Sequence, residues 1–309
     1  MPKVAVLKGG LSAEREVSLN TGAQVAAGLA AAGFRVAEID AADRDFIDQI
    51  LSEAPDVVFI CLHGRFGEDG TVQGLLELLG VPYVGSGVLA SALAMDKVIS
   101  KQLLKQANIP TADFLALRRD EPVDVVAISE ALGVKTVVKP ANEGSAIGIT
   151  ISHEPDELSA AVERAFLFDD RVLVEGFVSG TEVTVGVLGN DEPKALPTLE
   201  IVSEHEFFDY ESKYVPGLSR HIVPARISSE ADAECQRLAI EVHRLFGCKG
   251  MSRADMIVTT EGQVFVLETN TIPGMTSTSL YPDAARAAGI EFPQLCANLI
   301  ELALEGKED

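Results

Sequence analysis

The chain has 309 residues, a formal net charge of −22, 47% apolar residues and 23% charged residues. This length allows two or three compact units that each bury a core, so a disulfide-stapled mini-protein is excluded. The composition is that of a packed globular protein rather than a disordered chain. The negative charge argues against general attachment to nucleic acid or to an anionic membrane.

The cysteines and the apolar runs indicate the compartment. Cys61, Cys235, Cys248 and Cys296 lack the spacing of a zinc site or of a redox pair, and we expect them to be reduced and buried. No apolar run reaches the ~18 residues that a membrane-spanning helix needs. The run at residues 4–7 is too short for a signal peptide. These features favour a cytoplasmic protein.

Strand and helix patterns alternate in the first part of the chain. Strands are predicted at residues 4–7, 35–39 and 56–62, and helices at residues 14–32 and 43–52. Such alternation predicts a parallel sheet. A helix carrying Met95, Asp96 and Lys97 then leads out of this unit, which we expect to end near residue 95.

The remainder of the chain has an α+β pattern. Residues 96–179 contain predicted strands at 136–140, 149–152 and 171–177 and a predicted helix at 157–166. Residues 180–309 contain strands at 182–188, 255–258 and 264–267 and a helix at 231–246. No Pro-rich linker or long charge run separates these parts, so we expect them to pack together.

Two lysines and a glycine-rich turn are the first candidate binding residues. Residues 143–148 read Glu-Gly-Ser-Ala-Ile-Gly between two predicted strands. Backbone N–H groups of such a turn approach phosphate oxygens closely, and Lys97 and Lys139 can offset the phosphate charge. Taken singly, a glycine turn and a lysine are ordinary surface features. Lys139 follows a run expected to be buried, where a charge needs a partner.

Carboxylates form a second group. Asp255 ends the run Arg253-Ala254-Asp255, and Glu268 and Asn270 follow a predicted strand two residues apart, on the same face of an extended chain. Magnesium prefers such oxygen ligands and completes its shell with water and phosphate oxygens. The alternative is that each is a solvated residue at a strand end.

Two polar segments complete the candidate set. Residues 269–280 follow a strand and offer hydroxyl and backbone donors for a carboxylate or an oxyanion, although hydroxyl-rich segments are usually turns. Residues 206–217 contain two of the four tyrosines. This second segment is either a lid over a ligand or a small apolar cluster under a surface loop.

Four ordered motifs carry a family resemblance. They are Gly-Leu-Ser-Ala-Glu-Arg-Glu-Val-Ser at 10–18, Leu-His-Gly-Arg-Phe-Gly-Glu-Asp-Gly at 62–70, Met-Asp-Lys at 95–97 and Glu-Thr-Asn-Thr-Ile-Pro-Gly-Met-Thr at 268–276. Together they resemble the D-alanine:D-alanine ligase family of the ATP-grasp superfamily. The resemblance runs from Val4 to about Leu304.

The resemblance implies α/β and α+β classes in a three-domain ATP-grasp architecture. An N-terminal α/β domain with an open parallel sheet would span residues 1–95. A central α+β domain (96–179) and a C-terminal α+β domain with a lid loop (180–309) would grip ATP between them. The family commonly forms homodimers through the N-terminal domain, and we expect the same here.

The resemblance also implies the site residues for ATP and metal. Two magnesium ions, for which manganese can substitute, would be held by Asp255, Glu268 and Asn270. The residues implied to bind the phosphates, the adenine and the ribose of ATP are Lys97, Lys139, Glu143, Gly144, Ser145, Glu175, Gly176, Phe177, Val178, Glu182, Lys213 and Asn270.

The implied reaction joins two D-alanines to D-alanyl-D-alanine, a peptidoglycan precursor. The first carboxylate would attack the γ-phosphate of ATP, and the resulting acyl phosphate would be attacked by the second amine. The implied substrate residues are Glu14, His63, Arg253, Ser279 and Leu280. The implied catalytic residues are Glu14, Ser145, Tyr214, Arg253 and Gly274, of which the first three match family residues that hydrogen-bond to one another.

Some positions depart from the family pattern. Phe208 stands where many relatives have Tyr, Gly176-Phe177 replaces Lys-Trp, and Ala146 replaces a second Ser in the phosphate loop. The histidines at 153, 205, 221 and 243 match no role, so we expect surface or hydrogen-bonded core histidines. Two alternatives stay open: a ligase with another acceptor, such as D-lactate or D-serine, and a non-catalytic nucleotide-binding regulator.

Overall fold

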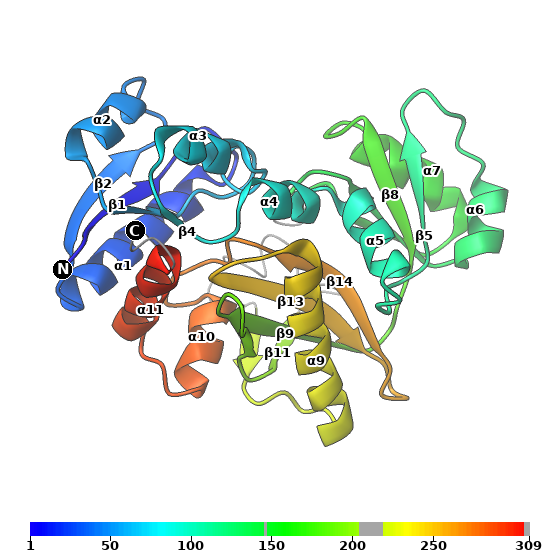
Figure 1. Cartoon of the computed structure of the whole chain (residues 1–309). Helices are drawn as coiled ribbons and strands as arrows, with labels where there is room; N and C mark the ends of the chain where they lie inside the picture. The colour runs from blue at the N-terminus through cyan, green and yellow to red at the C-terminus, as the bar shows by residue number, and fades with distance from the viewer. Residues whose placement is uncertain (145–146, 204–218, 306–309) are drawn as a thin grey trace.

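Three β-sheets organise the computed structural model, which describes residues 1–144, 147–203 and 219–305. The sheet formed by the first part of the chain and the sheet of the central part lie at opposite ends of the molecule, and the third sheet lies between and below them in the view of Figure 1. The cavities described below lie where these parts meet.

The first sheet is parallel, as the strand and helix alternation predicts. Its strand order is β2-β1-β3-β4. The central residues of its first strand, Val4 to Leu7, are fully buried because helices cover both faces of a parallel sheet. The elements of this part are β1 (Lys3–Lys8), α1 (Arg15–Ala31), β2 (Arg35–Asp40), α2 (Phe46–Glu53), β3 (Val57–Ile60), α3 (Thr71–Leu79) and β4 (Tyr83–Val84).

The end of the chain completes the core of this first sheet. Helix α11 (Phe292–Leu304) lies beside α1, close to the N-terminus, and α10 (Leu280–Ala287) packs next to α11 (Figure 1). Leu295 and Leu299 of α11 share one buried cluster with Leu29 of α1. Gly28 makes this approach possible, because a Cβ there would lie 2.9 Å from the ring of Phe292.

Two helices connect the first sheet to the second. They are α4 (Val88–Met95) and α5 (Lys97–Gln106), so the single helix predicted across Met95, Asp96 and Lys97 is wrong. Asp96 is extended, and its carboxylate accepts hydrogen bonds from the N–H groups of Val98 and Ile99, both at 3.1 Å. Such N-capping begins a new helix, so Lys97 becomes the first residue of α5.

The central sheet is antiparallel, with strand order β5-β8-β6-β7, and helices α6 and α7 pack on it. The predicted strand at 136–140 is confirmed at both ends, and the predicted helix at 157–166 differs by one or two residues at each end. The elements are β5 (Phe114–Arg118), α6 (Val125–Leu132), β6 (Thr136–Pro140), β7 (Thr150–Ser152), α7 (Pro155–Ala165) and β8 (Arg171–Gly176).

The third sheet has six strands in the order β12-β11-β9-β13-β14, with β10 paired to β9. The predicted strands around 255–258 and 264–267 are longer than expected, so Asp255 lies inside a strand and Glu268 and Asn270 belong to its neighbour. The elements are β9 (Thr181–Leu188), β10 (Lys194–Ala195), β11 (Leu199–Ser203), β12 (Ser219–Ile222), α9 (Ser229–Phe246), β13 (Met251–Val258) and β14 (Val264–Asn270).

The four cysteines are free and buried, as expected. Burial raises the pKa of the Cys248 thiol to about 11, and the hydroxyl of Ser86 partly opposes this shift. Within the described ranges, the helices are too short or too polar to cross a membrane.

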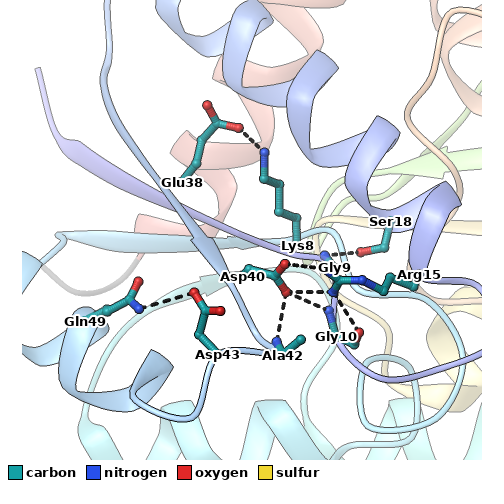
Figure 2. Close-up of polar contacts among 10 residues, drawn as sticks. All are labelled: Lys8, Gly9, Gly10, Arg15, Ser18, Glu38, Asp40, Ala42, Asp43 and Gln49. Atoms are coloured by element: carbon teal, nitrogen blue, oxygen red, sulfur yellow. Dashed lines mark hydrogen bonds and ion pairs between the residues drawn. The ribbon is translucent and has the colours of Figure 1, made fainter.

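Hydrogen bonds fix the loop between β1 and α1, as Figure 2 shows. The carboxylate of Asp40 accepts from both terminal nitrogens of Arg15, at 2.9 and 2.6 Å, and from the N–H groups of Gly10 and Ala42. Gly9 donates its N–H to Ser18 at 2.8 Å. Gly9 and Gly10 have φ values of +74° and +76°, which glycine adopts without steric cost.

These contacts generate a prediction about pH. The Arg15 guanidinium holds the pKa of Asp40 well below its usual value. Asp40→Asn is expected to lower the free energy of unfolding at pH 7 by about 1 kcal/mol or less, because a charge-assisted hydrogen-bond network is lost that solvent partly screens. The pKa of Asp40 is lower in the folded protein than in the unfolded chain, where it is about 3.9. The stabilisation by Asp40 is therefore complete at pH values above about 3.9 and is lost as the pH falls below that value.

Urea denaturation at several pH values measures this effect. The stability difference between the wild type and Asp40→Asn should narrow from pH 7 towards pH 3. Asp43→Asn is the matched control, because its nearby carboxylate is joined to Gln49 by a contact of 3.4 Å on the exposed surface. A difference that stays constant with pH, or an equal one in Asp43→Asn, would contradict the assignment.

Candidate active site

Two adjoining cavities lie between the three parts of the chain. The first has a volume of about 120 Å³ and the second a volume of about 390 Å³. Lys97, Gly144 and Glu268 line both cavities. These residues come from α5, from the glycine-rich loop and from β14, so one junction joins the helix after the first sheet to the second and third sheets.

Glu14 lies where the first cavity meets the glycine-rich loop. It is buried just before α1, and the fixed loop of Figure 2 holds the backbone that leads to it. Its carboxylate lies against two glycines: a Cβ at Gly64 would be 2.7 Å from its Oε2 atom, and a Cβ at Gly144 would be 3.0 Å from it. Glu14 therefore links the first part of the chain to the base of the glycine-rich loop.

His63 lies on the same wall of the first cavity as Glu14, and its pKa is raised. Its side chain is buried, and its Nε2 atom lies 3.2 Å from the hydroxyl of Thr21. Burial alone lowers the pKa of His63, but Glu68, which hydrogen-bonds to it, and Glu14 raise the pKa above its usual value. A protonated imidazole at this position suits a carboxylate ligand.

Arg253 lies on β13 in the wall of the first cavity. Its guanidinium donates to both oxygens of Asp255, at 2.8 and 2.7 Å, and both side chains are buried. Asp255 also accepts a hydrogen bond of 2.6 Å from the hydroxyl of Thr184. The pair lies two residues apart on one strand, so the two side chains share a face of the sheet.

The far wall of the first cavity is formed by the segment that leads into α10. Ser279 immediately precedes this helix, and its hydroxyl accepts from the N–H of Thr276 at 3.0 Å. Gly274 is close by, because a Cβ there would lie 2.9 Å from the Ser279 hydroxyl oxygen. Leu280 is the first residue of the helix, and the free N–H groups at such a terminus favour an anion.

The second cavity is lined by Lys139 and Glu175. Lys139 is buried, and its amine lies 2.5 Å from Glu175 Oε2, so the partner that its position requires is found on β8. Burial alone lowers the pKa of Lys139, but Glu175 and Glu268 raise it above its usual value. The other oxygen of Glu175 lies 2.5 Å from the amine of Lys101.

Lys97 connects the glycine-rich loop to the third sheet. Its amine donates to the backbone oxygen of Glu143 at 2.7 Å and lies 3.7 Å from the carboxylate of Glu268. The start of the loop is also fixed by Asn142, whose backbone and side-chain nitrogens both donate to Asp169, at 2.9 and 2.7 Å. Two cations therefore enter the second cavity from different elements, Lys97 from α5 and Lys139 from β6.

Gly176 and Phe177, which replace the Lys-Trp of the family pattern, lie at the edge of the second cavity. The amine of Lys135 lies 3.7 Å from the centre of the Phe177 ring, and both residues line the cavity. A Cβ at Gly176 would lie 2.9 Å from the backbone oxygen of Leu132, so a side chain here would require this turn to shift. Val178 and Glu182 continue the same wall.

The proposed metal ligands are neighbours on paired strands. In the antiparallel register of β13 and β14, the backbone of Asp255 lies opposite that of Glu268, and the backbone of Arg253 lies opposite that of Asn270. Among the residues that the structure describes, no group of three or more His, Cys, Asp or Glu side chains is arranged to hold a metal ion. The set is two carboxylates and one amide, and such oxygen donors fit magnesium, which takes its remaining ligands from water and phosphate.

Every predicted site residue that the structure describes lines one of the two cavities. Ser145, Tyr214 and Lys213, together with Ala146, Phe208 and the lid segment 206–217, lie outside the described residues. In the first cavity are Glu14, His63, Arg253, Asn270, Gly274, Ser279 and Leu280. In the second are Lys139, Glu143, Glu175, Gly176, Phe177, Val178, Glu182 and Asp255, while Lys97, Gly144 and Glu268 line both.

Sequence reasoning missed four residues that hold these side chains in place. They are Glu68 beside His63, Thr184 beside Asp255, Lys135 beside Phe177 and Lys101 beside Glu175. Two of them had a sequence signal: Glu68 lies in the motif at residues 62–70, and Lys101 follows Lys97 by one helical turn.

The histidines without an assigned role have ordinary environments. His243 is buried and hydrogen-bonded to Ser252 at 2.7 Å, and His221 pairs with Asp283 at 2.7 Å. His153 is exposed, and His205 lies outside the described residues.

Comparisons with known proteins cover nearly the whole chain. The family model described as "D-ala D-ala ligase C-terminus" matches residues 103–301, and the one described as "D-ala D-ala ligase N-terminus" matches residues 41–86. Two relatives named D-alanine–D-alanine ligase come from Syntrophobacter fumaroxidans, at 52% identity, and Pelotomaculum thermopropionicum, at 48%. Each alignment covers 98% of this chain and 97% of the relative.

Solved structures agree with the sequence comparisons. The crystal structure of D-alanine–D-alanine ligase from Bacillus anthracis complexed with ATP matches at a TM-score of 0.86 and 34% identity, over 98% of both chains. A second structure of the Bacillus anthracis ligase matches at a TM-score of 0.87 and 35% identity, again over 98% of both chains. The predicted α/β and α+β ATP-grasp architecture is thereby confirmed, and the chain belongs to the D-alanine–D-alanine ligase family.

Proposed function

We propose that the protein joins two D-alanines to D-alanyl-D-alanine at the cost of one ATP, releasing ADP and phosphate. The observation that carries this proposal is the junction at Lys97, Gly144 and Glu268, where a cavity suited to an amino acid opens beside a larger one suited to a nucleotide. Transfer of a phosphoryl group between the two ligands needs this adjacency. Relatives with the ligase name and a neighbour complexed with ATP support it.

In the first step, the carboxylate of one D-alanine attacks the γ-phosphorus of ATP. Glu14 binds its ammonium group and His63 lies near its carboxylate, which orients that carboxylate towards the junction. Lys97 and Lys139 offset the negative charge that spreads over the transferring phosphoryl group. The bond from the γ-phosphorus to the β,γ-bridging oxygen breaks, and the products are ADP and an acyl phosphate.

In the second step, the amine of the second D-alanine attacks the carbonyl carbon of the acyl phosphate. Its carboxylate is held by Ser279 and the N-terminus of α10, which faces the first cavity. Arg253 and the N–H of Gly274 stabilise the tetrahedral oxyanion. The bond from the carbonyl carbon to the phosphate oxygen breaks as the peptide bond forms, and the attacking amine gives up one proton, which leaves with the phosphate. Exclusion of water protects the acyl phosphate, the task that we assign to the segment 206–217 with Tyr214.

Asp255, Glu268 and Asn270 are the residues that would hold two magnesium ions. When bound, such ions neutralise phosphate charge and orient the phosphate oxygens. Arg253 now occupies both oxygens of Asp255. We infer that Arg253 turns towards the acyl group and leaves Asp255 free when the ligands enter.

Three further expectations belong to this proposal: action in the cytoplasm, a homodimer formed through the N-terminal domain, and manganese as a substitute for magnesium. Among the alternatives, the names of the relatives favour D-alanine over D-lactate or D-serine as acceptor and favour an enzyme over a non-catalytic regulator. Sedimentation that shows only monomer would contradict the homodimer.

The direct test incubates the protein with ATP, magnesium and D-alanine and measures ADP release and the product mass. We expect ADP and D-alanyl-D-alanine in equal amounts. A parallel reaction adds D-lactate or D-serine as the second substrate. ADP formed only with one of these acceptors would overturn the substrate assignment, and no ADP with any acceptor would overturn the enzymatic function.

Glu268→Gln tests the role of the junction. It removes one negative charge from the proposed metal ligands while keeping the shape of the side chain, so kcat should fall by about 100-fold or more. Glu261→Gln is the control, because Glu261 is exposed in the turn between β13 and β14. Equal activity of the two variants would refute a role for Glu268 in the site.

Gly64→Ala tests the placement of Glu14. The new Cβ would fall 2.7 Å from the Glu14 carboxylate, so we expect the KM for D-alanine to rise by about tenfold or more while the KM for ATP stays within about twofold. The Gly64 φ of +68° also causes backbone strain in the variant.

Gly80→Ala is the matched control for that strain. Gly80 has a φ of +66°, and a Cβ there would meet nothing within 4 Å. Both variants should lose stability to a similar degree, but only Gly64→Ala should change the KM for D-alanine. A similar change of this KM in both variants would show that general strain, not displacement of Glu14, is the cause.

A further inference from the structure

Lys101 is the most deeply buried cation of the nucleotide site, although it touches neither cavity. Its side chain is 1% exposed, and its amine lies 2.5 Å from Glu175 Oε1. The same amine donates to the hydroxyl of Thr111 at 2.6 Å. Lys101 therefore lies behind Glu175, whose other face lines the second cavity.

Lys101 contacts the central sheet through Glu175 and reaches β14 through Thr111. It lies one helical turn after Lys97 on α5, so both amines project from the same side of that helix. Thr111 donates its hydroxyl to the backbone oxygen of Val266 at 2.6 Å, and Val266 donates its N–H to Pro110 at 2.8 Å. Lys101 thus connects α5, the central sheet and β14, the strand that carries Glu268.

The charges in this cluster do not cancel. Glu175 contributes one negative charge, and Lys101 and Lys139 contribute two positive charges, with each lysine on its own carboxylate oxygen. Burying a charge without a partner is costly, so a single lysine would form a closed pair with Glu175. The second lysine therefore leaves one positive charge that Glu175 does not compensate. Glu268 on β14, which lines the same cavity, attracts both lysines from outside this cluster.

We propose that Lys101 is a positioning residue for phosphate recognition: it neutralises and orients Glu175, which leaves the charge of Lys139 available to a phosphate group of the nucleotide. This inference rests on the proposed function. Lys101 acts through Glu175 and Lys139 and does not contact the nucleotide itself. Its removal should therefore weaken binding of a phosphorylated nucleotide much more than binding of the neutral nucleoside.

The test compares Lys101→Met with the wild type in calorimetric binding of ATP, ADP and adenosine at constant magnesium concentration. Met keeps the length and apolar stem of the side chain and removes the charge. We expect the Kd values for ATP and ADP to rise by about 10- to 100-fold, while that of adenosine changes less than about threefold. A purely structural role would weaken adenosine binding to the same extent.

Lys105→Met is the matched control on the same helix. Lys105 is half exposed and pairs with Asp113 at 2.8 Å on the surface, so its removal should leave all three Kd values within about twofold. Lys101→Arg keeps the positive charge and should keep the ratio of the adenosine and ATP Kd values within about threefold of the wild type. Equal losses for ATP and adenosine in Lys101→Met, or no loss for either, would overturn the proposal.

A second variant decides the question if Lys101→Met does not fold. Lys101→Met combined with Glu175→Gln removes both buried charges and leaves Lys139 with its positive charge, as in the wild type. The ratio of adenosine to ATP Kd values should then stay within about threefold of the wild-type ratio, even if both affinities fall. A ratio of the adenosine Kd to the ATP Kd that falls more than about threefold below the wild-type ratio would overturn the proposal.

The wild-type measurements separate this proposal from the proposed function. A wild type that does not bind ATP more tightly than adenosine would contradict the nucleotide site as a whole. If the wild type binds ATP more tightly than adenosine and the Lys101→Met variant does so to the same extent, only the role of Lys101 is contradicted.

Discussion

The ion pairs of Glu175 with Lys101 and Lys139 are the contacts on which the arrangement of the second cavity depends. A carboxylate inside a protein is stable only if cations or donors surround it, and here both cations come from other elements, α5 and β6. Thr111 extends the cluster to β14. Helix α5 and strands β6 and β8 are thus held in one arrangement, because their separation would leave buried charges unpaired, and a hydrogen bond joins β14 to them.

The residues that we propose to act on ligands are paired with one another in this structure. Arg253 binds Asp255, Lys97 lies near Glu268, and Lys139 binds Glu175. Each pair contains a cation suited to a phosphate or an oxyanion and a carboxylate suited to a metal or an ammonium group. Ligand entry therefore exchanges partners rather than creating charge contacts from solvated groups, which reduces the desolvation that binding would otherwise require.

Local patterns predicted the elements well where one stretch of sequence determined them. The run at 136–140 forms β6 as predicted, and α1 begins and ends within one residue of its predicted range. The break at Asp96 was missed because its capping bonds depend on the local backbone. Lys101 was missed for another reason: lysines one turn apart usually face solvent, and only the pairing of α5 with β8 buries this one. The packing of α11 against α1 is equally non-local.

The walls of the second cavity contain three lysines and five carboxylates. The position of these charges determines what a polyanion such as ATP meets when it binds there. Lys139 lies with Glu175 at the central sheet, whereas Asp255 and Glu268 are paired neighbours on the third sheet. Phosphate groups that reach from one side to the other would meet these carboxylates and be repelled. Divalent cations at Asp255, Glu268 and Asn270 would reverse that repulsion. The two carboxylates on the third sheet therefore support the proposal that these residues hold divalent cations when ATP binds.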